Sequence, residues 1–315
     1  EGIALRKAGL KLPILVFGPV LQEQVGLAAT YRLTISITSP QAVDRVIEGM
    51  EKLALEAAGA VEPISVHLKV ETGMGRFGIW PKEAAAAARA IAGHPGLRLE
   101  GVYTHFATAN QSRGAYFQKQ WSLFQEALHN LKEAGFSNLI RHCANSAAII
   151  AFPDCYLDMV RCGTMLYGQK PVVDQGKEIK LQDPWRFLAR VLEVRTLPAG
   201  HGIGYGVVYR TKKASRIAVL PVGIVDGVNM EPVLQPTGIK DVIKGTAKLW
   251  LRYLKIGRQN IMVKFEAGAA PVVGKVGMQL LMVDVTHLPQ VEIGSVAQVP
   301  LRRTAAGQDI PRHYV

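Results

Sequence analysis

The sequence predicts a two-part α/β protein: a (β/α)8-type barrel, incomplete at its N-terminus, followed by a C-terminal antiparallel β domain. Two observations predict the barrel. Apolar runs typical of buried strands alternate with helical segments through the first half, and polar motifs follow successive strands at their C-terminal ends. A change near Pro184 predicts the β domain, because short strands separated mostly by Gly and Pro follow it. We therefore expect a barrel domain at residues 1–183 and a β domain at residues 184–315.

The elements of the first half follow from apolar periodicity and helix-capping residues. Ser39-Pro40 is a typical helix start and predicts a helix to about residue 58. Further helices are expected at 81–92 and 116–134. Strands are expected at 12–18, 32–36, 66–70, 97–103, 139–143 and 165–168. These six strands are two fewer than a closed barrel needs, and the missing units would precede Glu1.

The second half reads as short strands interrupted by one basic segment. The strands are expected at 191–194, 217–220, 261–265, 272–276, 280–285 and 296–299. Within residues 238–257 the cations Lys240, Lys244, Lys248 and Arg252 recur every four residues and would form one stripe of a helix. Such a helix either packs on its own domain or makes peripheral contact with an anionic membrane or partner.

Composition narrows the class of protein. The 315 residues are 49% hydrophobic, which is enough for a large core. Their net charge of +12 favours an anionic ligand or partner. Zinc-finger spacing and RNA-binding aromatic motifs are missing, so we expect no nucleic-acid partner. No signal peptide or membrane-spanning apolar run is evident. Cys143, Cys155 and Cys162 lack CxxC spacing and read as reduced, buried thiols of a cytoplasmic protein.

Residues 66–78, VHLKVETGMGRFG, read as a strand that ends in a tight turn. Apolar and polar residues alternate up to position 71, after which Thr72-Gly73-Met74-Gly75 breaks the strand. The two glycines allow positive φ and leave room for a ligand to approach. Lys69 and Arg76 flank this turn at a strand end, where α/β folds bind ligands, anionic ones especially. The alternative is an ordinary junction with two solvated cations.

Three later loops carry groups that suit a ligand. His105 follows the strand at 97–103, Ser146 follows the strand at 139–143, and Arg161 precedes the expected strand at 165–168. Ser146 beside helix-opening alanines offers a hydroxyl and backbone N–H groups, which favour a phosphate. Taken singly, such a histidine or arginine is more often structural. Gathered at one barrel mouth, they favour a phosphate-bearing aromatic cofactor.

The chain resembles alanine racemase in several segments. HLKVETGMGRFG, EGVYTHFATAN, RHCANSAAIIAFP, DMVRCGTMLYG, GIGYGVVY, the DG at 226–227 and PVVGKVGMQLLMVDVT match that family in order and spacing. EGIALRKAGLKLPILVFG also fits the family's passage before its third barrel strand. The resemblance implies a barrel that binds pyridoxal 5′-phosphate, a C-terminal β domain, a small amino-acid substrate, and a homodimer whose active sites borrow residues from the partner subunit.

The resemblance also implies roles for individual residues. His105 would lie against the cofactor's pyridine ring, Arg161 would face its nitrogen, and Asn145 would also bind the cofactor. The phosphate would be held by Ser146, Gly163 and Thr164. Arg76 and the backbone of Met278 would bind the substrate carboxylate, Lys69 would be the candidate for carbamylation, and Tyr205 would be a catalytic base offered across the dimer.

The chemistry of racemisation agrees with these roles. A proton leaves one face of the α-carbon and returns to the other, so two acid/base groups are needed. Arginine cannot give its proton to a pyridine nitrogen, which keeps the ring unprotonated and disfavours transamination. An ordinary phenol ionises near pH ~10, so a tyrosine base needs positive charge beside it.

The chain departs from the family in places. The lysine that forms the Schiff base is absent, since the segment like VVKA-AYGHG that carries it would precede Glu1. Ile224 stands where the family usually has a tyrosine at the substrate channel, and the terminal passage at 303–310 is shorter. Three hypotheses follow: an alanine racemase, a racemase for another small amino acid, or a non-catalytic relic that binds cofactor or a partner.

Overall fold

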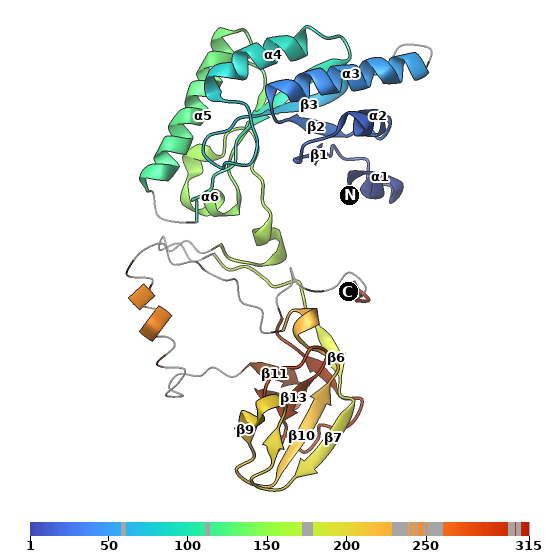
Figure 1. Ribbon diagram of the computed structural model, residues 1–315, viewed down its shortest axis with the longest axis vertical. Helices are drawn as coiled ribbons and strands as arrows, with labels where there is room; N and C mark the ends of the chain where they lie inside the picture. Colours follow the sequence, from blue (N-terminus) through green and yellow to red (C-terminus); the bar gives the residue numbers. More distant parts are fainter. Residues whose placement is uncertain are drawn as a thin grey trace. The chain divides into compact units, whose positions relative to one another are not determined.

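The computed structural model describes residues 1–57, 61–110, 114–171, 179–228, 261–301 and 310–314, with single residues or short runs at 239, 242–243, 245–247, 250 and 306. Contacts among these residues divide the chain into two compact units, Glu1–Pro184 and Trp185–Val315, which are drawn in Figure 1. Each unit has its own sheet and its own hydrophobic core.

The first unit is a curled parallel sheet of five strands in the order β1-β2-β3-β4-β5 (Figure 1). The strands are β1 (Leu15–Val16), β2 (Thr34–Ile37), β3 (Ile64–Lys69), β4 (Leu97–Tyr103) and β5 (Ile140–His142). Among the described residues, six α-helices accompany them: α1 (Gly2–Lys7), α2 (Gln22–Thr30), α3 (Pro40–Glu56), α4 (Ala84–Ala92), α5 (Ala115–Glu133) and α6 (Ser146–Ala151). The parallel α/β order expected of a barrel is confirmed.

Local sequence signals explain where these elements begin. The Ser39 hydroxyl accepts a hydrogen bond from the Ala42 amide, so Ser39 is the N-cap of α3 and Pro40 is its first residue, as predicted. The helix α2 was not predicted, because its first residue follows a leucine N-cap rather than a Ser, Thr, Asp or Asn.

The sixth strand predicted for this half is wrong. Residues Thr164–Tyr167 form a short 3-10 helix, η3, that Gly168 ends with a φ of 68°. Local i+3 hydrogen bonds, from the Leu166 amide to Gly163 and from the Gly168 amide to Met165, close this turn. An apolar run of three residues between glycines is too short to specify a strand. The described residues continue the sheet beyond β5 only by a single parallel bridge between Asn145 and Arg161.

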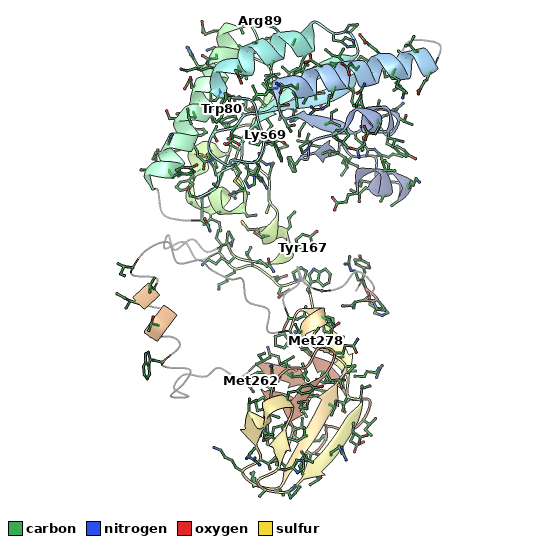
Figure 2. All side chains as sticks on the ribbon, viewed as in Figure 1. Lys69, Trp80, Arg89, Tyr167, Met262 and Met278 are labelled. Atoms are coloured by element: carbon green, nitrogen blue, oxygen red, sulfur yellow. The ribbon has the colours of Figure 1, made fainter. Side chains whose placement is uncertain are left out.

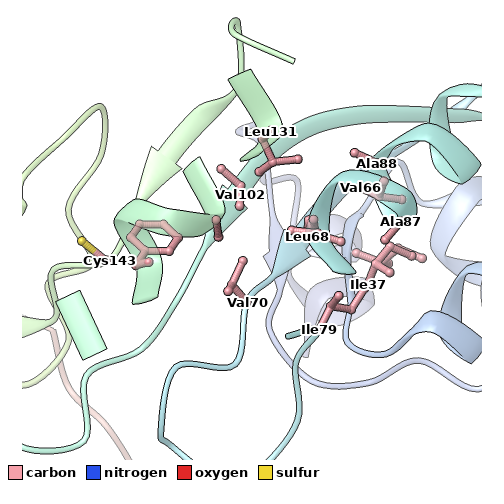
Figure 3. Packing of buried hydrophobic residues seen from close by; sticks show 14 of the residues in the cluster. Ile37, Val66, Leu68, Val70, Ile79, Ala87, Ala88, Val102, Leu131 and Cys143 are labelled. Atoms are coloured by element: carbon pink, nitrogen blue, oxygen red, sulfur yellow. The ribbon is translucent and has the colours of Figure 1, made fainter. Parts of the chain in front are cut away.

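The core of the first unit lies between the sheet and its helices. Val66 and Leu68 of β3, both fully buried, face Ala88 of α4 and Leu131 of α5 within one cluster (Figure 3). The intervening polar residues of β3 point to the opposite face of the sheet, because side chains alternate along a strand. The sheet thus has one apolar, helix-covered face and one polar face.

The second unit is an antiparallel sheet of seven strands in the order β6-β14-β11-β12-β13-β10-β7, with a separate two-stranded pair β8-β9. The strands are β6 (Leu188–Arg190), β7 (Glu193–Leu197), β8 (Gly202–Ile203), β9 (Tyr209–Arg210), β10 (Ser215–Leu220), β11 (Met262–Phe265), β12 (Gly268–Val273), β13 (Leu281–Asp284) and β14 (Val296–Gln298). The predicted antiparallel β domain is confirmed, although β6, β8 and β9 were not predicted.

The basic segment predicted at 238–257 falls largely outside the described residues. Of this segment the structure describes helical conformation at Ile239, Val242, Ile243, Gly245, Thr246, Ala247 and Trp250. The four cations of the predicted stripe are not among them.

Replacing Leu68 tests the packing of the first unit. Leu68 is fully buried between the sheet and the helices, so Leu68→Ala should lower the free energy of unfolding by about 2–5 kcal/mol, through lost apolar burial and the cavity left behind. Urea denaturation followed by circular dichroism measures this. Leu55→Ala is the matched control, because Leu55 is 83% exposed, and it should change the value by less than about 0.5 kcal/mol. Equal effects of the two substitutions would contradict the described core.

Candidate functional site

The polar face of the parallel sheet brings together residues from four strands. Lys69, Tyr103 and His142 are register partners across β3, β4 and β5, so their side chains lie in one row on the same face. Two residues before Lys69 on β3, His67 is the register partner of Ser36 on β2. The Tyr103 hydroxyl lies 2.8 Å from the Ser36 hydroxyl, and the Tyr103 ring stacks on His142 with 4.9 Å between ring centroids.

Arg161 lies just beyond this row and is held by neutral acceptors. Its guanidinium donates to Nδ1 of His142 at 2.8 Å, to the carbonyl of Thr104 at 2.6 Å and to the carbonyl of Cys143 at 3.3 Å. It also lies over the rings of Phe17 and Tyr103. Burial lowers the pKa of Arg161 to about 10, so the group remains a cation near neutral pH.

Lys69 is buried on the same face. Its exposed fraction is 2%, and its ammonium donates to the carbonyl of Val70 at 2.8 Å. Burial lowers the pKa of Lys69 to about 8; Glu71 opposes this shift, whereas Arg161 and Arg76 add to it. Lys69 therefore lies among cations, with one carboxylate nearby.

The turn after β3 is organised by Glu71. One of its carboxylate oxygens accepts the amides of Gly73, Met74 at 2.6 Å and Gly75 at 3.2 Å, and its other oxygen is buried without a hydrogen bond in the described part of the chain. Gly73 and Gly75 have φ values of 133° and 71°, which only glycine adopts readily. Arg76 follows this turn with an exposed side chain.

His105 is a half-buried imidazole that stays neutral. Its pKa is lowered to about 4, mainly by burial and in addition by the charges of Arg161, Arg76 and Lys69. The backbone around it is fixed, because the side chain of Gln120 bonds the His105 carbonyl at 3.3 Å and the Ala107 amide at 2.9 Å. The shared electrostatic influence places His105, Lys69, Arg76 and Arg161 in one positively charged region.

The start of α6 and the loop after Arg161 are joined by a hydrogen bond between Ser146 and Gly163. Ser146, the first residue of α6, accepts the Gly163 amide on its Oγ at 3.0 Å. The space where a Cβ of Gly163 would lie is open, with no atom within 4 Å. Thr164 follows as the first residue of η3. Asn145 serves as the N-cap of α6, accepting the Ala148 amide at 3.1 Å and donating to the Phe106 carbonyl at 3.2 Å, so its side chain is engaged locally.

Two predicted site residues lie in the second unit. Tyr205 begins the 3-10 turn η4 (Tyr205–Val207) and is 80% exposed. It lines a pocket of about 400 Å³ together with Gly204, Lys275, Gly277, Leu280 and Met282. Met278, next to Gly277, is 61% exposed and is labelled in Figure 2, where Lys69 marks the first-unit site.

Ile224 lies beside the Met278 loop. It begins the 3-10 turn η5 (Ile224–Asp226), and its amide donates to the Gly277 carbonyl at 3.0 Å. The Val225 amide donates to the Met278 carbonyl at 3.1 Å. Asp226 closes the turn through a 2.8 Å bond from the Gly223 amide. Ile224, at the position where a tyrosine was expected from the resemblance, therefore lies next to the loop that carries Met278.

The structure thus gathers Lys69, Arg76, His105, Ser146, Arg161 and Gly163 in the first unit, and Tyr205 and Met278 in the second. Sequence reasoning missed Tyr103, His67 and His142 as neighbours of Arg161. The alternation in VHLKV and the strand-end position of His142 were usable signals, but the strand register was needed to join them.

This arrangement can hold a flat aromatic base and an anion. A neutral imidazole, a donor-only guanidinium, a hydroxyl and a backbone amide supply stacking, a hydrogen bond to a ring nitrogen, and phosphate or carboxylate contacts. In the part of the chain that the structure describes, no group of three or more His, Cys, Asp or Glu side chains could hold a metal ion. None of the described helices has the length and apolar character to cross a membrane.

Comparisons with known proteins agree over both units. Residues 1–171 match the family model "Alanine racemase, N-terminal domain", and residues 185–309 match "Alanine racemase, C-terminal domain". An alanine racemase from Desulfovibrio desulfuricans is 35% identical over 294 residues, which are 93% of this chain and 71% of that protein. An alanine racemase from Desulforamulus reducens is 38% identical over 337 aligned positions, covering 100% of this chain and 82% of that protein.

Solved structures give the same result. An alanine racemase from Clostridium difficile 630 matches with a TM-score of 0.77 and 27% identity, covering 96% of this chain and 71% of that one. An alanine racemase from Bacillus anthracis with bound L-Ala-P matches with a TM-score of 0.72 and 32% identity, covering 98% of this chain and 70% of that one.

The lowered pKa of His142 predicts how the free energy of unfolding changes in acid. Burial lowers the pKa of His142 to about 2, whereas an unfolded histidine titrates near 6.5. Between these values the unfolded chain binds a proton that the folded site does not, so the free energy of unfolding falls as pH falls, by up to about 1.4 kcal/mol per pH unit. His142→Asn should remove this contribution from the slope between pH 6 and 4.

Denaturation series at several pH values measure that slope. His129→Asn is the matched control, since His129 lies on the exposed side of α5, and it should leave the slope of the parent chain in place. A His142→Asn slope equal to that of the parent chain would show that His142 already binds a proton in the folded protein.

Proposed function

The chain belongs to the alanine racemase family, and from this premise we propose that it interconverts L- and D-alanine with pyridoxal 5′-phosphate as cofactor. The observation that carries the proposal is the first-unit site, where His105 follows β4, the Ser146–Gly163 pair follows β5, and Arg161 contacts His142 at the end of β5. Each supplies a different contact that this cofactor requires.

The residues present fit the cofactor. Arg161 has five N–H groups, and the three described acceptors leave two for a ring nitrogen. His105, neutral because its pKa lies near 4, suits the face of an aromatic ring. The Ser146 hydroxyl and the open space beside Gly163 suit a phosphate, with the Thr164 amide adjoining. The Gly163 amide, which donates to Ser146 here, would turn to the phosphate when it binds. Asn145, which caps α6, would fix the position of Ser146.

When bound, pyridoxal phosphate accepts the electron pair left at the α-carbon of the substrate. Arg161 would hold the cofactor's ring nitrogen unprotonated, because a guanidinium does not release its proton near neutral pH. This limits how far the negative charge spreads and favours return of the proton to the α-carbon over transamination. Arg161 is therefore assigned an electrostatic role.

Tyr205 would take and return the α-proton on one face of the substrate. Its hydroxyl lies on an exposed turn of the second unit, whereas the cations that would favour its ionised form, such as Lys69 and Arg76, belong to the first-unit site. We propose a homodimer in which each active site uses Tyr205 and Met278 of the partner subunit. Arg76 and the Met278 backbone would then bind the substrate carboxylate.

The other face of the substrate needs a second base. The family places a lysine there, at the end of its first barrel strand, and we propose that racemisation requires that lysine in addition to Tyr205. One alternative has a specific observation in its favour. Ile224 beside the Met278 loop replaces a polar phenol with an apolar side chain and favours a different small amino acid. A chain that binds cofactor without this lysine would be a non-catalytic relic.

The test combines cofactor titration with proton exchange. Pyridoxal phosphate is titrated into the 315-residue chain and into a form extended before Glu1 by the strand with the family lysine, and each is given alanine, serine and other amino acids in D2O. We expect both to bind cofactor and the extended form to interconvert D- and L-alanine. Tyr205→Phe should reduce α-deuterium uptake from one enantiomer by at least about 100-fold.

The outcomes separate the hypotheses. Preference for another amino acid supports the second racemase hypothesis, whereas binding without exchange in either form supports the relic. Failure of both forms to bind cofactor overturns the proposal. Exchange unchanged in Tyr205→Phe for both enantiomers removes Tyr205 from the mechanism. Tyr314→Phe is a control, because Tyr314 is 91% exposed near the end of the chain and has no assigned role.

Lys69 is proposed to be carbamylated. With its pKa near 8, about a tenth of its amine is neutral at pH 7 and can add to CO2, forming an N–C bond and releasing a proton. The product would be an anion among Arg161 and Arg76 instead of a third cation. In 13C-bicarbonate we expect a carbamate 13C signal that Lys69→Met removes and that Lys52→Met, at an exposed lysine, retains. Persistence of the signal in Lys69→Met would place the carbamate elsewhere.

A further inference from the structure

Behind Arg161, two buried imidazoles and a carboxylate continue the line of contacts. Nδ1 of His142 lies 2.8 Å from the Arg161 guanidinium, and Nε2 of the same ring lies 2.8 Å from Nδ1 of His67. Nε2 of His67 then lies 3.9 Å from a carboxylate oxygen of Glu100. His142 is fully buried and His67 is 4% exposed, so water does not compete at either ring.

The direction of these hydrogen bonds follows from the chemistry of Arg161. A guanidinium can only donate, so Nδ1 of His142 must accept and the proton of His142 must be on Nε2. That proton is donated to Nδ1 of His67, whose own proton must then be on Nε2, facing Glu100. A second proton on either ring would place two donors against each other. Both rings are therefore neutral Nε2–H tautomers.

The strands are shaped to admit this arrangement. The pairing of β3 with β4 shifts between Val66 and His67, so that Val66 pairs with Leu99 and His67 pairs with Gly101. Glu100 is the extra residue of this bulge, which aims its side chain at His67. A Cβ on Gly101 would lie 2.5 Å from the His67 ring and 2.8 Å from the Ile140 carbonyl, so the ring occupies space that only glycine leaves.

The charged groups around the two rings favour their neutral forms. For His67, burial lowers the pKa, Arg161 adds to this and Glu100 opposes it. For His142, burial, Arg161 and His67 lower the pKa, while Asp158 opposes them. Arg98, 3.4 Å from the other oxygen of Glu100, competes for that carboxylate. Tyr103 stacks on His142 without adding a charge at neutral pH.

We propose that His67 is a positioning residue that acts through His142: by accepting the His142 Nε2–H, it fixes the tautomer that leaves Nδ1 to accept from Arg161, and so holds the guanidinium toward the cofactor's ring nitrogen. The last clause rests on the proposed function, whereas the tautomer assignment does not. None of the described acceptors of Arg161 is a carboxylate. The relay, by which we mean the hydrogen bonds from Arg161 to His142 and from His142 to His67, therefore orients the cation without neutralising it.

The first experiment needs no cofactor. The 315-residue chain is labelled with 15N in its histidines, and long-range 1H–15N spectra are recorded between pH 6 and 8, with His67 and His142 assigned by substitution. We expect unprotonated Nδ1 and protonated Nε2 in both rings throughout. Protonation of Nδ1 in either ring overturns the proposal, whatever happens in cofactor titrations.

The second experiment uses a matched pair of substitutions. His67→Phe keeps an aromatic ring but offers no acceptor, so it leaves the buried Nε2–H of His142 unsatisfied. His142 should then populate the other tautomer in part, and its Nδ1–H form no longer accepts from Arg161. His67→Asn places an amide oxygen near the former Nδ1 and should restore the parent tautomer. His129→Phe, on the exposed side of α5, is the control. A His142 tautomer unchanged in His67→Phe overturns the role given to His67.

Cofactor titration of the same variants tests the link to Arg161. His67→Phe should weaken pyridoxal phosphate binding about tenfold, as loss of an outer hydrogen-bond partner typically does, whereas His67→Asn and His129→Phe should match the parent chain. Equal affinity of His67→Phe and the parent chain overturns the link. If the parent chain itself binds no cofactor, the proposed function fails, and the spectra still decide whether the relay exists.

Discussion

The first-unit site depends on a half-buried cation that no carboxylate in the described part of the chain neutralises. Arg161 is held by an imidazole and two carbonyls, and its positive charge acts on several titratable groups nearby. It is among the causes that lower the pKa of His142, His105 and Lys69. Concentrated positive charge in a partly dehydrated region is unfavourable unless an anion shares it. The site is therefore arranged for a ligand with negative charge, which a phosphate and a substrate carboxylate both provide.

The sheet register is the second constraint. Lys69, Tyr103 and His142 meet because three parallel strands are aligned with their polar positions on one face. The same alternation sends Val66 and Leu68 to the helices, so alternate residues of one strand, β3, specify the core and the site. A shift of one residue in β3 would turn the apolar set toward the site and bury the polar set, including Lys69, against the helices. Stability of the core and geometry of the site are thus coupled.

The sequence predicted most of the architecture because the signals were local. Ser39-Pro40 predicted the start of α3, alternation predicted β3, and the glycine-rich turn predicted positive φ at Gly73 and Gly75. The prediction failed at Met165–Tyr167, where a short apolar run forms a 3-10 turn. The neighbours of Arg161 could not be predicted, because His67 reaches His142 only through a bulge at Glu100 and the missing side chain of Gly101. Such contacts depend on pairing between strands distant in sequence.

The groups suited to cofactor binding and to proton transfer are divided between the two units. The first unit holds the cations, the neutral imidazoles and the hydroxyl that suit a cofactor, while the second holds an 80%-exposed phenol on a glycine-flanked turn. A phenol in water is a poor base, and a group of cations without an anion is poorly stabilised. Each unit therefore supplies what the other lacks. The proposed homodimer, in which Tyr205 of the partner subunit would serve the first-unit site, would resolve both deficits.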